Sequence, residues 1–152
     1  MSTHRLHQRI FLAVATIGIP LVSTACIGPG WTDHDDDIVS ELKIEIPKSA
    51  TNIVGHAGKG IDFLIPNTEW RAYVAKYYPG KTLSQRPSKE IDGSVPAECI
   101  PAFRSGTELS HWITGEDIQY RNTNNHVYRF VRVTPDCEPG KAFVQWRLGE
   151  PE

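Results

Sequence analysis

The chain has 152 residues, with 16 lysines and arginines against 18 aspartates and glutamates, and its formal net charge is −2 at neutral pH. This mildly acidic balance, with no basic block after the N-terminal segment, argues against binding to nucleic acid or to anionic lipid. The length suits one domain with a substantial core and leaves no room for a second.

The first 26 residues have the pattern of a bacterial export signal. Arg5 and Arg9 supply positive charge, an apolar core covers residues 10–22, and the small residues 23–25 precede Cys26. The core holds about 13 residues, whereas a helix that crosses a bilayer needs about 20. The segment is therefore predicted to be a cleaved signal, residues 1–25, and not a permanent membrane span.

Over residues 1–26 the chain resembles bacterial lipoproteins, whose signal ends in small residues before the cysteine that receives the lipid. That family generally prefers leucine three residues before the cysteine, where this chain has Ser23. The resemblance implies that Cys26 carries a thioether-linked diacylglycerol, often with a third acyl chain, and anchors the protein to the extracytoplasmic face of the cell membrane. The alternative is ordinary cleavage before residue 26, which would release a soluble secreted protein.

The resemblance also accounts for the odd number of cysteines. Lipidation of Cys26 leaves Cys99 and Cys137, which are expected to form a disulfide in an oxidising compartment. A metal site or a catalytic thiol would need closely spaced ligands or a paired histidine, and the sequence provides neither. No metal or other cofactor is therefore expected.

Residues 26–38 are predicted to form a flexible acidic tether after the lipidated cysteine. Its aspartates at 33, 35 and 37 have the spacing of a calcium loop, but Ile38 stands where that loop requires glycine. The globular domain is placed at residues 39–149. Its first element is expected to be a half-buried strand, because apolar Leu42, Ile44 and Ile46 alternate with charged residues.

A hairpin is expected next, from the apolar segments at 53–54 and 61–65 on either side of a glycine-rich turn. A helix over residues 68–78 follows, because its large apolar side chains recur at helical spacing. Residues 81–106 look like a long loop, and 107–112 like a short helical turn. Three strands close the chain, near 118–120, at 127–133 and at 142–148, with a loop over 134–140 that contains Cys137.

Together these elements predict an α+β fold in two layers, with an antiparallel sheet of about five strands and one main helix, at 68–78, packed across a face. The helix ends in Tyr77 and Tyr78, which with Trp112 are the candidate binding surface.

No catalytic motif is apparent, so the domain is predicted to be a non-enzymatic module that binds an envelope protein or a cell-wall component. The competing hypothesis is a small envelope hydrolase with its site in the 81–117 region. Ser94, Ser110 and His111 have the residue types of a nucleophile and a base, but no G-x-S-x-G sequence surrounds any serine.

Overall fold

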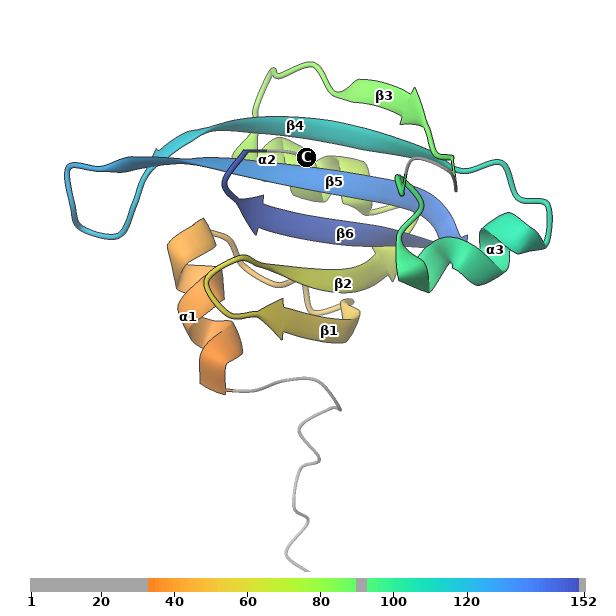
Figure 1. Cartoon of the computed structure of the whole chain (residues 1–152), viewed down its shortest axis with the longest axis horizontal. Coiled ribbons are helices and arrows are strands. Elements are labelled where there is room, and N and C mark those ends of the chain that lie inside the picture. The colour runs from red at the N-terminus through yellow and green to blue at the C-terminus, as the bar shows by residue number, and fades with distance from the viewer. Residues whose placement is uncertain (1–32, 90–92, 151–152) are drawn as a thin grey trace, which may run out of the picture.

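The computed structural model describes residues 33–89 and 93–150, so the export signal and Cys26 lie outside the described residues. The fold is mostly β, a single antiparallel sheet of six strands in the order β1-β2-β6-β5-β4-β3, with short helices packed against it (Figure 1). The strands are β1 (Thr51–His56), β2 (Gly60–Pro66), β3 (Ser84–Pro87), β4 (Ser110–Gln119), β5 (His126–Glu138) and β6 (Lys141–Leu148). The helices are α1 (Asp33–Leu42), α2 (Trp70–Tyr77) and α3 (Ile100–Arg104), the last preceded by a 3-10 turn, η1 (Ala97–Cys99).

One face of the sheet, here called the covered face, carries the main core. Alternate residues of β2, β5 and β6 point to this face and pack against α1 and α2. The buried members are Ile38, Leu42, Ile44, Ile61, Phe63, Ile65, Trp70, Val74, Tyr78, Val131, Val133, Ala142, Val144 and Trp146. Trp146 and Phe63 are fully buried, and the ring of Tyr78 stacks on Trp146 with centroids 5.8 Å apart.

Helix α1 corrects two predictions made from the sequence. Residues 33–38 of the expected tether are helical, and the expected strand over Leu42, Ile44 and Ile46 is the end of a helix followed by an irregular segment. Ile38 and Leu42 lie one turn apart and are both buried, which gives α1 its place on the sheet. The alternation that suggested a strand arises because Leu42 and Ile44 enter the same core from a helix and from the segment after it.

Arg129 of β5 joins α1 to the sheet. Its guanidinium donates hydrogen bonds to the carbonyl oxygens of Leu42, at 2.9 Å, and Lys43, at 3.4 Å, and so satisfies acceptors at the end of the helix. The same group donates to Glu116 at 2.7 Å and lies over the rings of Tyr78 and Trp146. This buried charge is therefore compensated on several sides.

The expected hairpin at 53–65 is present as β1 and β2, and the expected helix at 68–78 corresponds to α2, which has only eight residues. The region read as a long loop contains β3 and α3. The expected helical turn at 107–112 is absent: residues 107–109 are irregular, and 110–112 are the start of β4, a strand of ten residues that pairs with β3 and β5. Strand β5 also continues through most of the expected loop at 134–140, and β6 begins directly after it at Lys141.

A second, smaller core lies on the opposite face, under η1 and α3. Leu64 and Phe143 from the sheet pack there with Leu109 and with the disulfide between Cys99 and Cys137. The disulfide thus ties the segment before β4 to the end of β5, as the sequence predicted.

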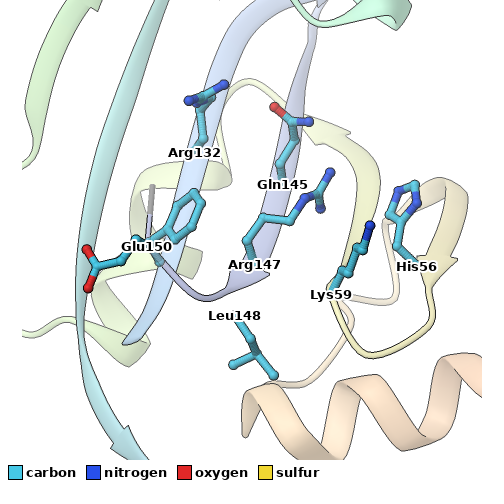
Figure 2. A pocket seen from close by; sticks show the side chains of 8 residues that line it. His56, Lys59, Arg132, Gln145, Arg147, Leu148 and Glu150 are labelled. Carbon is cyan, nitrogen blue, oxygen red and sulfur yellow. The ribbon is translucent and has the colours of Figure 1, made fainter. Parts of the chain in front are cut away.

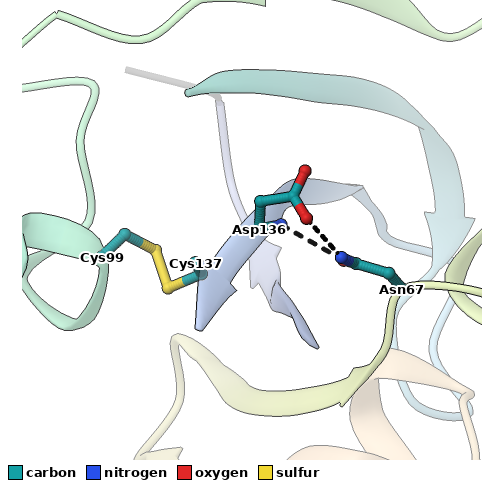
Figure 3. Close-up of a disulfide and its surroundings, with 4 residues drawn as sticks. All are labelled: Asn67, Cys99, Asp136 and Cys137. Atoms are coloured by element: carbon teal, nitrogen blue, oxygen red, sulfur yellow. Dashed lines mark hydrogen bonds between the residues drawn. A yellow bond between two sulfur atoms is a disulfide. The ribbon is translucent and has the colours of Figure 1, made fainter. Parts of the chain in front are cut away.

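The end of β5 is also held from its other side (Figure 3). Asn67 donates a hydrogen bond to the carboxylate of Asp136 at 2.6 Å and accepts one from the Asp136 backbone N–H at 3.2 Å. Asp136 has a positive φ of 59°, in an irregular part of the ladder between Thr134 and Glu138.

Among the described residues, none of the helices has the length and apolar character that a membrane crossing requires.

Candidate functional site

The second core covers only one end of its face of the sheet. The rest of that face, here called the open face, consists of the residues of β1 to β6 that point away from α1 and α2 and are not covered by α3. Val54 lies there beside Asp62 and is 46 % exposed, the most exposed large apolar side chain in the described part of the chain. The site is therefore a sheet surface with helices behind it.

Two adjoining hollows cross the open face. The first, of about 550 Å³, is bordered by the end of β1, the β1–β2 turn, β5 and β6, and the second, of about 780 Å³, lies over β3, β4 and β5. Phe130 and Arg132 line both hollows, so the two meet at these side chains and are together called the depression. The first is lined by His56, Lys59, Phe130, Arg132, Gln145, Arg147, Leu148 and Glu150, and Figure 2 labels all of them but Phe130.

A buried carboxylate organises the first hollow. Asp62 is 5 % exposed and accepts two hydrogen bonds from the guanidinium of Arg147, the longer at 2.9 Å. The same carboxylate lies 2.9 Å from His56 Nε2. Such a two-pronged pair fixes the plane of the guanidinium, so Arg147 is a rigid part of the hollow's wall.

Gly60 makes room for this pair. A Cβ atom added at Gly60 would lie 1.9 Å from the carbonyl oxygen of Trp146 and 2.8 Å from Cδ of Arg147. The Arg147 side chain therefore runs directly over the glycine on its way to Asp62. Any side chain at position 60 would displace it.

Tyr128 provides a flat surface beside the second hollow. A Cβ atom added at Gly115 would lie 2.7 Å from two ring carbons and from the hydroxyl oxygen of Tyr128, so this side chain rests on the backbone of β4. The ring is half-buried, lines the hollow and stands at 31° to the ring of Phe130, with centroids 6.4 Å apart.

The described residues that line the depression are predominantly basic, although the whole chain is acidic. Its lining includes four basic side chains, Lys59, Arg86, Arg132 and Arg147, and one described acid, Glu150. Asp62, below the lining, offsets one more positive charge. A cationic surface with planar amide and guanidinium groups is suited to an anionic ligand.

Of the residues that suggested a hydrolase, Ser94 and His111 line the second hollow and Ser110 does not. Ser110 and His111 follow each other in β4, so their side chains point to opposite faces. Ser110 accepts a hydrogen bond from Gln85 at 3.1 Å, whereas Nδ1 of His111 lies 3.1 Å from the hydroxyl of Ser88. Ser88 and His111 are both buried, and Ser94 lines the second hollow. Of the three residues proposed from the sequence, only Ser94 and His111 thus share the second hollow. The hydroxyl that is hydrogen-bonded to His111 belongs to a different residue, Ser88.

The aromatic residues proposed as a binding surface lie on the covered face. Tyr78 is 2 % exposed, and its hydroxyl donates to the carbonyl oxygen of Arg129 at 3.0 Å. Burial raises the pKa of this phenol to about 12. Tyr77 and Trp112 are half-buried and pack against the main core. Tyr78 is thus unavailable to a ligand, and the other two contribute mainly to packing.

The arginines, Gln145 and Tyr128 of the open face were not identified from the sequence. A signal was present, because polar Gln145 and Arg147 alternate with apolar Val144 and Trp146, and Arg132 stands between two valines. That alternation places them on a face away from the core but says nothing of what covers them. In the described part of the chain, no three His, Cys, Asp or Glu side chains gather closely enough to hold a metal ion.

Comparison of the chain with models of protein families, with curated proteins and with solved structures finds no match in any of the three. The chemistry of the open face and the pattern of the N-terminal sequence therefore provide the basis for a function.

Proposed function

We propose that this protein is an extracytoplasmic lipoprotein, held at the cell membrane through Cys26, whose domain binds an envelope component on its open face and catalyses no reaction. The observation that carries the proposal is the asymmetry of the sheet. Helices α1 and α2 pack over the core of one face, whereas the other face carries two adjoining hollows lined by basic and aromatic side chains. Concave surfaces with a few well-placed polar groups are typical of binding sites.

The route of the chain is compatible with this arrangement. Seven residue steps separate Cys26 from the start of α1, and a fully extended chain of that length spans at most about 25 Å. A lipid on Cys26 would thus keep the domain close to the bilayer. Because α1 packs on the covered face, the chain enters the domain on the side away from the depression, which leaves the open face accessible to a ligand.

The binding role can be tested in intact cells with a photo-crosslinking amino acid. We would place it at Gln145, in the first hollow, and in a matched protein at Ala75, which is exposed on α2 behind the sheet. We expect covalent adducts with envelope material from position 145 and not from position 75. Equal labelling from both positions, or none from either, would contradict a binding role for the open face.

The anchor has a separate test, mass spectrometry of the mature N-terminus. A lipoprotein gives an N-terminal peptide that begins at Cys26 and carries two or three acyl chains. Replacement of Cys26 by serine should then release the protein from the membrane fraction. An unmodified cysteine, or a Cys26→Ser protein that still sediments with membranes, would refute the anchor and leave the binding role to be judged by the crosslinking experiment.

A further inference from the structure

The basic side chains of the open face lie along a line that crosses the sheet diagonally. Arg132 of β5 pairs in register with Gln145, two residues before Arg147 on β6. On its other side, Arg132 pairs with Ile113 of β4. His111 lies two residues before Ile113 on β4 and pairs with Arg86 of β3. The basic residues are therefore displaced in the same direction along the strands from β6 to β5 and from β5 to β3, and together they form a diagonal across the sheet. We call Lys59, Arg147, Arg132 and Arg86 the cationic track.

The spacing of the track suits an extended ligand. Diagonal neighbours on adjacent strands, such as Arg147 and Arg132, are separated by about 7–8 Å. Arg86 lies two strands away from Arg132 and is offset by two residues, which corresponds to roughly 12 Å. Lys59 extends the line beyond Arg147, at the turn between β1 and β2. A compact anion would reach only one or two of these groups, whereas a linear chain with repeated negative charges would reach all of them.

Part of this positive charge is available to a ligand. Lys59 and Arg86 are exposed, and neither pairs with a carboxylate of the described residues. Arg147 is bound to Asp62, which orients its guanidinium within the wall of the first hollow. Lys59 and Arg86 at the two ends would supply positive charge, whereas Arg147, whose charge is offset by Asp62, would help to orient the ligand.

The ring of Tyr128 favours an anionic ligand that contains sugar rings. It rests on Gly115 with one side and borders the second hollow, in a surface whose other uncharged polar groups are mainly hydroxyls. A sugar ring offers both an apolar C–H face that can lie on an aromatic ring and hydroxyl groups that can bond to these side chains. When the carboxylate is part of the sugar itself, one residue can stack on Tyr128 while its neighbours' carboxylates reach the arginines.

From this arrangement we infer that the open face binds a linear polysaccharide whose sugars carry carboxylate groups. The inference rests on the proposed binding role of that face and names its ligand, but it is independent of the lipid on Cys26. The exposed Lys59 and Arg86 would hold the carboxylates, and Arg132 and Arg147 would line the path between them. Tyr128 would select a ring-bearing chain over other polyanions.

The test is a titration of the detergent-solubilised mature protein with polygalacturonate, followed by calorimetry. Dextran serves as the neutral polysaccharide and polyphosphate as the polyanion without sugar rings. We expect polygalacturonate to bind with an affinity that falls as salt is added, and we expect no binding of dextran. If dextran binds equally well, or polyphosphate binds as tightly as polygalacturonate, the inferred ligand class is wrong.

Substitutions test whether polygalacturonate binds at the cationic track. The double change Lys59→Gln and Arg86→Gln removes two exposed charges and should weaken polygalacturonate binding about threefold to tenfold. Lys76→Gln removes one exposed charge from α2 on the covered face and should leave affinity unchanged. Tyr128→Ala should weaken binding about fivefold to tenfold, and Tyr128→Phe should retain it. Equal effects of the track and control variants would overturn the assignment.

The outcomes separate this inference from the proposed function. If no probe binds while crosslinking from Gln145 still labels envelope material in cells, the carboxylate polysaccharide is excluded and the binding role of the face stands. If crosslinking fails as well, both are refuted.

Discussion

Removal of the disulfide between Cys99 and Cys137 should lower the free energy of unfolding by about 4 kcal/mol. The two cysteines are 38 residues apart, and a crosslink over such a loop lowers the entropy of the unfolded chain by about 13 cal/mol/K, which gives that free energy at 25 °C on the chain-entropy model. Domains of this size have net stabilities of about 5–15 kcal/mol, so the loss is a large fraction of the total.

Loss of the buried sulfur atoms should lower the free energy of unfolding further, and this part can be measured separately. Both cysteines are buried, at 0 % and 2 % exposure, against Leu64 and Phe143 in the second core. Reduction of the wild-type protein removes the crosslink and keeps the sulfur atoms. The double change Cys99→Ala and Cys137→Ala removes the sulfur atoms as well, and it should cost about 1 kcal/mol more for each residue, by analogy with a buried methylene.

The assay is urea denaturation of the oxidised, reduced and double-alanine proteins, followed by circular dichroism. The reduced protein should unfold at lower urea and with a steeper dependence on urea, because its unfolded chain exposes more surface. Its native spectrum should match that of the oxidised protein, because the crosslink acts mainly on the unfolded state. A reduced protein within 1 kcal/mol of the oxidised one would refute the reasoning.

Three further outcomes follow from single contacts. Gly115→Ala should destabilise the fold by about 1–3 kcal/mol in urea denaturation because its Cβ would strike the Tyr128 ring, and this cost should largely vanish in a Tyr128→Ala background. Glu116→Gln should cost about 2 kcal/mol in the same assay, because it removes the only carboxylate that pairs with buried Arg129 among the described residues. The raised pKa of Tyr78, about 12 against 10.0 when unfolded, predicts stability that is fully present below pH 10 and falls by roughly 2 kcal/mol as pH rises to 12. Urea midpoints across this range should fall less for Tyr78→Phe.

The elements that the sequence predicted well are those with local signals. The hairpin of β1 and β2 has a glycine-rich turn between apolar segments, and α2 has aromatic residues at helical spacing before Pro79 and Gly80. The disulfide followed from the resemblance and from the number of cysteines. In each case a few neighbouring residues, or a count, were enough to decide.

Helix α1 was not predicted because most of the contacts that stabilise it come from residues far along the chain. Its acidic start has low helix propensity and reads as a solvated linker. Only Ile38 and Leu42 mark a buried face, and their partners lie on β2 and β6, far along the chain. The carbonyl oxygens at its end are satisfied by Arg129, 87 residues away from Leu42. A pattern within ten residues contains none of this information.

The edge of the sheet was missed for a different reason. Strand β3 has four residues, all exposed, and includes Pro87 at its end. Nothing in it alternates between apolar and polar, so only pairing with β4 makes it a strand. The same pairing places Arg86 beside His111 and completes the diagonal of the cationic track. The open face therefore depends on strand order, which no single segment of the chain encodes.

The arginines of β5 illustrate how the fold assigns opposite roles to identical residues. Arg129 points to the covered face, where it holds the end of α1, whereas Arg132 points to the open face between the two hollows. Their three-residue separation gives them opposite directions in a strand. A shift of the strand by one residue would bury Arg132 and expose Val131 and Val133, so the register is strongly selected by the core. The packing that stabilises the covered face thereby also determines where the positive charge of the open face lies.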